Sequence, residues 1–380
     1  MNIAIFTDTY TPDVNGVAKT LKRFTDYLES NGDNYKVFAP KSAKSINESD
    51  HIYQHTSIPF LLYPECRFSI PNLLHVKAEL KQFEPDIIHV ATPFSIGLCG
   101  MHYAQKNNVP LVGSYHTDFD KYLEYYKLGK LSNGLWKYLN WFYKPMEKIF
   151  VPSMDTLQHL KIRGFDQLDI WERGVDSNLF HPNYNIEDLR NKYQIKEKFI
   201  LSYVGRLSPE KDIDCLTSII NSLPSELSNQ IHWLIVGDGP SKEELKNHIR
   251  QPVTFTGYLH GENLAEVYSC SDLFVFPSST ETFGNVVLES LSSGTPVIGA
   301  NAGGVKNIIE HNKQGLLCPP NHVPSFVQSI VSTLEDESKR KKMSFTAREY
   351  AKSKTWNNIF NLLLINYQAV ISQETLKKHA

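Results

Sequence analysis

Short apolar segments of strand length alternate with helical segments from the start of this chain, and this pattern restricts the fold more than any other feature. Residues 3–6 form an apolar run, residues 18–28 carry apolar side chains at helical spacing, and Asn31-Gly32 then stops the helix. Parallel strands need a crossover connection, usually a helix, so the alternation predicts a parallel sheet covered on both faces. Further strands of this sheet are expected at residues 35–39, 87–91, 111–115 and 149–152.

The same alternation restarts in the second half of the chain. With 380 residues, the chain is about two to three times the size of a common single domain. We therefore predict an α/β protein of two Rossmann-like, doubly wound domains that face each other across a cleft. The strands of the second sheet are expected at residues 199–205, 233–237, 253–257, 273–277 and 297–299. The expected domains are residues 1–175 and 176–355, followed by a helix over residues 356–380 that packs back across the seam.

The composition excludes several classes of protein. Lys and Arg number 39 and Asp and Glu 41, which argues against a general nucleic-acid binder because such proteins carry an excess of basic charge. The five cysteines are scattered without a CxxC pair, which is typical of a reducing compartment. The first residues lack the basic start and apolar core of a signal peptide, and no run of about 18 apolar residues occurs. The expected location is the cytoplasm, or the inner face of the membrane as a peripheral protein.

The strongest local motif follows the expected strand 273–277 and reads ETFGNVVLE at residues 281–289. In doubly wound sheets, ligands bind at the carboxyl ends of the strands. A helix is expected to start near Gly284, so the amide groups of residues 283–285 would point into the cleft and favour an anion.

Two acids flank this turn. Glu281 would lie in the loop before the helix and Glu289 about one turn inside it, where each could reach a hydroxyl group of a ligand. The alternative is an ordinary capped helix with acids in its first turns. The Phe-Gly pair between the acids and the later Gly303-Gly304 loop favour the binding site.

A second motif, GRLSPEKD at residues 205–212, also follows an expected strand. Arg206 and Lys211 would place two cations at the strand end, where they could neutralise a diphosphate leaving group. The alternative is a solvated Lys/Arg pair in a surface loop. The next strand ends in GDGP at residues 237–240, which lacks the third glycine of a dinucleotide fingerprint and gives an NAD site little support.

Two candidates lie in the first half of the chain. Gly16, in the loop between the first strand and the first helix, would let the backbone approach a ligand, although a simple turn would also use Asn-Gly. His116 follows the expected strand 111–115 and could handle a proton or a hydrogen bond in the cleft, with a purely structural histidine as the alternative.

No metal site is predicted. The DxD triplets at residues 118–120 and 212–214 are expected by chance in a chain with this many acids. His51 and His55 are four residues apart but have no third ligand nearby.

Together these motifs resemble the family-4 retaining glycosyltransferases, and the resemblance covers nearly the whole chain in the right order. Four motifs carry it: the E-x7-E element at residues 281–289, the Gly-Arg pair at 205–206 with Lys211, the sequence GDGP at 237–240, and the sequences DTY at 8–10 and NGV at 15–17. The resemblance implies a GT-B fold, a nucleotide sugar linked to GDP or UDP and held mainly by the C-terminal domain, no further cofactor, and metal-independent transfer with retention.

The resemblance also implies roles for single residues. Arg206 and Lys211 would stabilise the donor diphosphate, Glu281 would contact the donor sugar, and Glu289 would hold the ribose hydroxyls. His116 would lie beside the transferred sugar. The nucleotide-sugar-binding set is completed by Gly16, Gly237, Phe283, Gly284 and Asn285.

The acceptor is indicated by weaker features. Residues 119–148 are dense in aromatic and basic side chains, which suits a helix at a lipid headgroup surface, with an amphipathic core helix as the alternative. This segment and residues 67–71 are similar to the branch of the family that transfers mannose or another hexose to glycolipids. Two other functions stay open, a GT-B sugar-nucleotide epimerase and a hinged sugar-binding protein without enzymatic activity.

Overall fold

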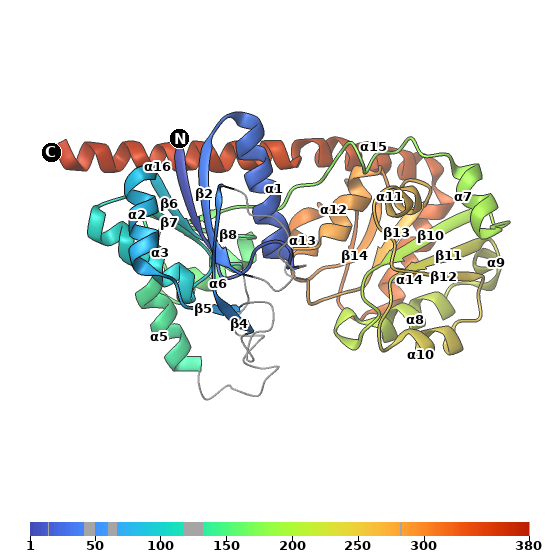
Figure 1. Cartoon of the computed structure of the whole chain (residues 1–380). Coiled ribbons are helices and arrows are strands. Elements are labelled where there is room, and N and C mark those ends of the chain that lie inside the picture. Colours follow the sequence, from blue (N-terminus) through green and yellow to red (C-terminus); the bar gives the residue numbers. More distant parts are fainter. Residues whose placement is uncertain (14, 42–49, 60–66, 117–131, 282, 380) are drawn as a thin grey trace. The chain divides into compact units, whose positions relative to one another are not determined.

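The computed structural model describes residues 1–13, 15–41, 50–59, 67–116, 132–281 and 283–379 (Figure 1). The chain forms two compact units, the first with residues 1–172 and 359–380 and the second with residues 173–358. The predicted division at residues 175 and 355 lies close to these limits. The packing of the last helix across the seam stays a prediction.

The first unit is built on a parallel seven-stranded sheet in the order β3-β2-β1-β6-β7-β8-β9. The strand order turns back at β1, which pairs with β2 on one side and β6 on the other. The strands are β1 (Asn2–Phe6), β2 (Asn34–Pro40), β3 (Ile52–His55), β6 (Ile87–Val90), β7 (Leu111–Ser114), β8 (Lys148–Val151) and β9 (Leu168–Ile170). A separate antiparallel hairpin joins β4 (Ser57–Pro59) to β5 (Arg67–Ser69). The helices of this unit include α1 (Gly16–Asn31), α2 (Leu73–Phe83), α3 (Ser95–Asn107), α5 (Ser132–Tyr143) and α6 (Met154–Ile162).

Local sequence explains these elements well. The β1 side chains from Ile3 to Phe6 are fully buried, as a parallel strand covered on both faces requires. Helix α1 begins where the Asn15 side chain accepts a hydrogen bond from the Ala18 amide, and it ends at Gly32 in the left-handed conformation.

Helix α16 (Trp356–His379) begins in the second unit and continues into the first. Within the first unit, Phe360 packs against Phe24, and the Tyr367 hydroxyl bonds to His89 Nδ1. His89 Nε2 lies 2.6 Å from Ser114 Oγ, so this buried imidazole ties the last helix to two neighbouring strands.

The second unit has a parallel six-stranded sheet in the order β12-β11-β10-β13-β14-β15. Its strands are β10 (Phe199–Val204), β11 (Ile231–Val236), β12 (Val253–Gly257), β13 (Leu273–Phe276), β14 (Val297–Ala300) and β15 (Gly315–Cys318). Its helices are α7 (Ile186–Tyr193), α8 (Ile213–Asn221), α9 (Ser225–Ser228), α10 (Lys242–His248), α11 (Glu262–Ser269), α12 (Asn285–Ser292), α13 (Val305–Ile308), α14 (Val323–Glu335) and α15 (Glu337–Ser353).

The predicted fold class is confirmed, and the structure has a strand at every position where the sequence predicted one. Three strands of the two parallel sheets, β3, β9 and β15, were not predicted from the sequence, and all three lie at sheet edges. The short antiparallel strands β4 and β5 were not predicted either. An edge strand is covered less than a central one, so β3 and β9 are short, half-buried segments with polar residues and lack the long apolar run of a buried strand. Among the described residues, no helix is long and apolar enough to cross a membrane.

Candidate active site

The loops that follow β10 and β13 lie beside each other at one edge of the second sheet. The two strands are paired in parallel, with Leu201 opposite Leu273, so their carboxyl ends deliver both loops to the same edge. The first loop, residues 205–212, contains the short helix Pro209–Lys211, and the second spans residues 277–284. The two strongest sequence motifs therefore meet in space.

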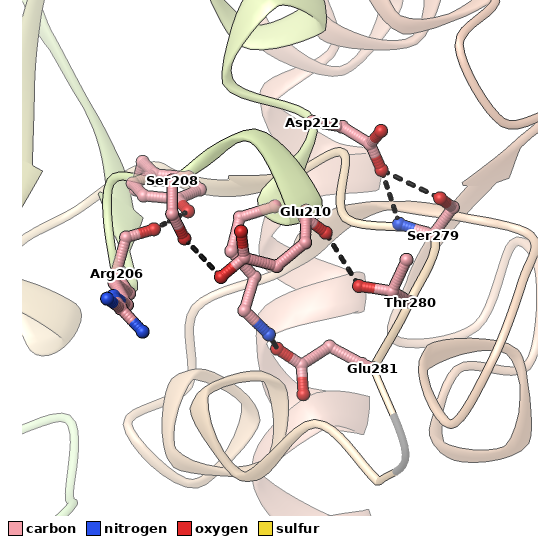
Figure 2. Close-up of polar contacts among 9 residues, drawn as sticks. Arg206, Ser208, Glu210, Asp212, Ser279, Thr280 and Glu281 are labelled. Carbon is pink, nitrogen blue, oxygen red and sulfur yellow. Dashed lines mark hydrogen bonds and ion pairs between the residues drawn. The ribbon is translucent and has the colours of Figure 1, made fainter. Parts of the chain in front are cut away.

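Lys211 and Glu281 form an ion pair between these loops, with Lys211 Nζ donating to Glu281 Oε1 (Figure 2). Their side chains are 22% and 21% exposed. A pair this far withdrawn from water loses less of its attraction to solvent screening than a surface pair does. The structure therefore couples the predicted diphosphate-binding lysine to the predicted sugar-binding glutamate.

Asp212 joins the same two loops through a second set of contacts. Its Oδ2 accepts hydrogen bonds from the Ser279 amide at 2.8 Å and from the Ser279 hydroxyl at 2.7 Å (Figure 2). A third bond runs from Thr280 Oγ1 to the Glu210 carbonyl oxygen at 2.6 Å. Asp212 has φ of +55°, a left-handed conformation that is unfavourable for a residue with a Cβ. We call these four residues, Glu210, Asp212, Ser279 and Thr280, the loop clamp.

The loop clamp was not predicted from the sequence. Asp212 appeared there only as the last residue of the GRLSPEKD motif, without a role of its own, and in a DxD triplet attributed to chance. Its signal would have been an acid placed directly at the start of a helix, next to the cationic motif. That signal is weak, because Ser279 lies 67 positions away in the sequence.

Arg206 is exposed at the start of the first loop. Within the described part of the chain, its guanidinium has no hydrogen bond or ion pair, while its carbonyl oxygen accepts from the Tyr203 hydroxyl at 3.3 Å. The pKa of Glu210 is lowered, first by the hydrogen bond from Ser208 and further by the charges of Arg206 and Lys211. The loop therefore offers one exposed cation and one cation already paired with an acid.

Glycines at the strand ends allow these loops to pack closely. Gly237 has φ of +135°, and a Cβ there would overlap the Gly205 carbonyl oxygen. The neighbouring loop is joined to the first by a hydrogen bond from the Leu207 amide to the Asp238 carbonyl oxygen at 3.0 Å. Gly237 thus has a clear packing role, and its contact with a nucleotide stays a prediction.

The turn before α12 is held from behind by the Gly303-Gly304 loop. The Gly304 amide donates to the Glu281 carbonyl oxygen at 2.7 Å, and a Cβ on Gly304 would overlap the carbonyl oxygen of Phe283. Gly284 is the N-terminal cap residue of α12, with φ of +96°, and Asn285 is the first helical residue and exposed. The helix therefore starts where the sequence predicted it.

Glu289 lies one turn inside α12 and is half-buried. The hydroxyl of the buried Tyr268 donates to Glu289 Oε2 at 3.2 Å. Burial, and next the charge of Glu289, raise the pKa of Tyr268, so this hydroxyl stays protonated and orients the carboxylate.

Gly16 and His116, the other two predicted site residues, belong to the first unit. Gly16 is the first residue of α1, and open space surrounds the position that a Cβ would take. His116 is half-buried and packs its ring edge-on against Trp171, with the ring centres 5.2 Å apart.

Asp8, the acid of the motif at residues 8–10, has a structural role. Asp8 is fully buried at the N-terminus of α3, where it accepts hydrogen bonds from Thr92 Oγ1, Ser95 Oγ and the Ile96 amide at 2.8, 2.9 and 2.8 Å. Burial raises the pKa of this carboxyl against the opposing effect of these hydrogen bonds. Asp8 therefore links the end of β1 to α3 and holds the loop that leads to Gly16.

The described residues contain no group of three His, Cys, Asp or Glu side chains that could hold a metal ion. His51 and His55 instead take part in ring contacts, with Tyr35 and Phe38 respectively. The triplet at residues 118–120 lies outside the described residues.

Residues 119–131 of the aromatic segment also lie outside the described part. In α5, which forms much of the rest, Trp136 and Tyr143 are buried and Tyr138 donates to the Pro93 carbonyl oxygen at 2.6 Å. Trp141 is exposed. Most of the described aromatic side chains therefore build the core, as the alternative interpretation held.

Comparisons with known proteins agree with this picture. Residues 14–179 match the model of the family described as Glycosyltransferase Family 4, and residues 185–350 match Glycosyl transferases group 1. The chain is 31% identical to a GDP-mannose-dependent alpha-mannosyltransferase of Corynebacterium glutamicum over 98% of this chain and 90% of that protein. It is also 31% identical to an alpha-monoglucosyldiacylglycerol synthase of Streptococcus pneumoniae, over 88% of this chain and 79% of that protein.

Among solved structures, the sucrose-phosphate synthase of Thermosynechococcus elongatus superposes with a TM-score of 0.76 at 21% identity, over 98% of this chain and all of that one. At this identity the likeness concerns the fold, and it confirms the predicted GT-B fold. The two relatives are named as a mannosyltransferase and a glucosyl-lipid synthase, and these names give no support to an epimerase or a hinged binding protein.

Proposed function

This chain belongs to glycosyltransferase family 4, and on that premise we propose that it transfers mannose from GDP-mannose to a hydroxyl group of a glycolipid or glycan. The observation that carries the proposal is the meeting of Arg206, Lys211 and Glu281 at the carboxyl ends of two neighbouring strands. The mannosyltransferase of C. glutamicum supports the choice of donor.

The geometry supports a different role for each of these residues. The exposed guanidinium of Arg206 can form a two-pronged contact with a diphosphate, while Lys211 adds a point charge held in place by Glu281. Positive charges that are already in place where negative charge develops in the transition state commonly give the largest part of an enzyme's rate enhancement. Here that negative charge develops on the departing diphosphate. Glu281 would also accept hydrogen bonds from the sugar hydroxyls, and Glu289, oriented by Tyr268, from the ribose.

The proposed reaction proceeds with retention. The bond from C1 of the sugar to the diphosphate oxygen breaks, and its electron pair leaves with the diphosphate. The acceptor oxygen forms its bond to C1 on the same face, and its proton passes to a diphosphate oxygen. No pair of carboxylates as in a glycosidase is needed. His116 would lie beside the transferred sugar.

The donor is tested by a thermal-shift panel of GDP, UDP, ADP and their hexose conjugates. A ligand at 100 times its Kd stabilises the native state by about 2.7 kcal/mol, enough for a measurable shift. A shift with GDP and GDP-mannose is expected. A shift confined to UDP and UDP-glucose would replace the donor with UDP-glucose. The name of the S. pneumoniae relative, a glucosyl-lipid synthase, supports glucose as this second candidate sugar.

The reaction class is tested by release of the nucleoside diphosphate. We expect release only when an acceptor is added, with an α-linked product by NMR, and full activity in EDTA because the proposed mechanism needs no metal. Conversion of the free donor to its C2 epimer would identify an epimerase, and binding without turnover a sugar-binding protein. Activity lost in EDTA and restored by Mg²⁺ or Mn²⁺ would contradict metal independence.

The proposal extends to the partners and the location. A lipid acceptor would bring the enzyme to the inner face of the cytoplasmic membrane as a peripheral protein. Residues 119–148 were expected to meet that surface, and in the described part Trp141 is the exposed aromatic side chain that suits such contact.

A further inference from the structure

Arg348 of α15 joins the end of α12 to the segment that precedes α7. Its guanidinium donates to the Ser292 carbonyl oxygen at 2.6 Å and to the Phe180 carbonyl oxygen at 2.8 Å. It also donates to the Ser177 carbonyl oxygen and to the Ser292 hydroxyl, both at 3.1 Å. Ser292 is the buried last residue of α12, and its hydroxyl donates to the Phe180 carbonyl oxygen at 2.7 Å. One half-buried side chain thus connects two segments that lie 112 positions apart.

This set of contacts requires a guanidinium. The acceptors are carbonyl oxygens and a hydroxyl, and within the described ranges of the chain Arg348 forms no ion pair. A guanidinium presents five N–H donors in a rigid planar fork, whereas a lysine ammonium is a compact point charge with three donors. Basic side chains near the C-terminus of a helix also bind carbonyl groups that have no partner within the helix. Arg348 therefore fixes the end of α12.

Phe180 carries this restraint to Tyr268. Both rings are buried, and they pack edge-on with their centres 5.9 Å apart. Phe274 of β13 also packs edge-on against the Tyr268 ring, at 5.4 Å. The hydroxyl of Thr295, three residues after the end of α12, donates to the Tyr268 carbonyl oxygen. The position of the Tyr268 ring therefore depends on the Phe180 backbone, which Arg348 holds.

The Tyr268 hydroxyl links this network to the candidate site, because it donates to Glu289 Oε2 at 3.2 Å. Hydrogen bonds between two oxygens are commonly about 2.5–3.0 Å long, so a small displacement of the ring would break this one. Glu289 also lies in α12 itself, three residues before Ser292. Arg348 thus acts on Glu289 in two ways, through the end of its helix and through the hydroxyl that orients its carboxylate.

We propose that Arg348 is a positioning residue that holds Glu289 for the ribose of the donor nucleotide. The ribose contact rests on the proposed function, whereas the restraint is a property of the second unit. Loss of the guanidinium releases the end of α12 and the Phe180 backbone, so the Glu289 carboxylate loses its fixed orientation. The diphosphate contacts proposed for Arg206 and Lys211 do not depend on this network.

The test measures recognition of the ribose hydroxyls by isothermal titration calorimetry. GDP is compared with dideoxy-GDP, which lacks both hydroxyls, and UDP with dideoxy-UDP. The variants are Arg348→Gln, Arg348→Lys, Tyr268→Phe and Glu289→Ala, each measured at a temperature where it is folded. Arg340→Gln is the matched control, because Arg340 also lies on α15 and donates to a backbone carbonyl oxygen, that of Leu334, at 3.1 Å.

The expected readout is the ratio of the affinities for the two members of a pair. In the wild type, the hydroxyls should tighten binding on the order of tenfold or more, because they bond to a charged group. Glu289→Ala should bring the ratio close to one. Arg348→Gln and Tyr268→Phe should lower the ratio about threefold or more and leave dideoxy-nucleotide affinity near the wild-type value. Arg348→Lys should recover only part of the ratio, and it carries the test alone if Arg348→Gln does not fold.

A merely structural role predicts a different result. Arg340→Gln should lower the melting temperature without changing the ratio. A wild-type ratio in both Arg348 variants would overturn the positioning role. An equal fall of the ratio in Arg340→Gln would show general loosening of the unit and would overturn it as well.

A double-mutant cycle in urea unfolding tests the restraint without any nucleotide. Arg348→Gln or Arg348→Lys combined with Tyr268→Phe should destabilise the protein by less than the sum of the single effects, because both changes break one network. Arg340→Gln combined with Tyr268→Phe should be additive. An additive cycle for Arg348 would overturn the positioning role.

The two experiments separate this proposal from the proposed function. Binding of neither GDP nor UDP by the wild type would refute the proposed donor, while a non-additive cycle would still support the restraint of Glu289 by Arg348. Sugar transfer with an additive cycle and an unchanged ratio would leave the reaction standing and overturn the role of Arg348.

Discussion

Asp212 offers a direct test of how the second unit positions its candidate catalytic residues. Its carboxylate accepts two hydrogen bonds from Ser279, and a hydrogen bond to a charged group contributes about 1.5–3 kcal/mol. Asp212 is half-buried and the Ser279 hydroxyl can turn to water, so we discount the sum to about 2–4 kcal/mol for Asp212→Ala. The alanine would keep the unfavourable φ of +55°.

Asp212→Gly removes the same carboxylate and also relieves the left-handed strain, which costs a non-glycine residue about 1 kcal/mol. Urea unfolding should therefore place the glycine variant about 1 kcal/mol above the alanine variant in stability. If the loop clamp acts only on stability, activity should follow the same order. If it positions Glu281 and Lys211, both variants should lose turnover to a similar extent.

We expect both variants to lower kcat on the order of 10- to 100-fold with a smaller change in KM, because a displacement of about 1 Å in a reacting group has effects of this size. Asp212→Asn keeps one oxygen acceptor and tolerates the backbone conformation, so it should recover most of the activity. Gln194→Gly is the matched control, since Gln194 has φ of +56° at the end of α7 in the same unit. Wild-type kcat in Asp212→Gly at a temperature where the variant is folded would refute the positioning role.

Three further predictions follow from single contacts. Glu281→Ala and Lys211→Ala should each lower kcat about 100-fold or more with the fold intact. The control Lys192→Ala, which breaks the 2.9 Å ion pair with Glu266 between α7 and α11, should leave kcat unchanged. Near-normal turnover in either site variant would contradict the assignment. Gly304→Ala should weaken donor binding measured by calorimetry, because the added Cβ displaces the carbonyl of Phe283, and unchanged affinity would show that this turn does not reach the donor. Burial lowers the pKa of His89 from its ordinary 6.5 to about 3. Between these pH values the imidazole binds a proton in the unfolded chain but not in the folded one, so the free energy of unfolding should fall by about 1.4 kcal/mol per unit as the pH drops from 6.5 towards 3. His89→Gln should flatten this part of the pH profile of urea unfolding, and an unchanged slope would assign it to other groups.

Local periodicity determined most of the fold. Strands such as β1 and β10 are buried on both faces and therefore appear in the sequence as continuous apolar runs separated by helices. The edge strands β3 and β9 lack such runs because one side of each has no neighbour, so only the assembled sheet defines them.

The candidate site, like the fold, was predicted from the sequence only in part. The sequence placed Arg206, Lys211 and Glu281 at strand ends, because each motif directly follows an apolar run. It could not pair Lys211 with Glu281, 70 positions apart, since only the pairing of β10 with β13 brings their loops together.

Composition alone left two interpretations open where a residue type serves two purposes. The aromatic residues of 119–148 suit a lipid surface and a core equally well, and the packing of α5 placed Trp136 and Tyr143 inside. The sequence by itself determined two doubly wound sheets, the order of their motifs and the family to which they belong, because these depend on neighbours along the chain. Tertiary structure alone decided the loop clamp around Asp212 and the burial of Asp8 at α3, because the hydrogen bonds at both places join segments far apart in sequence.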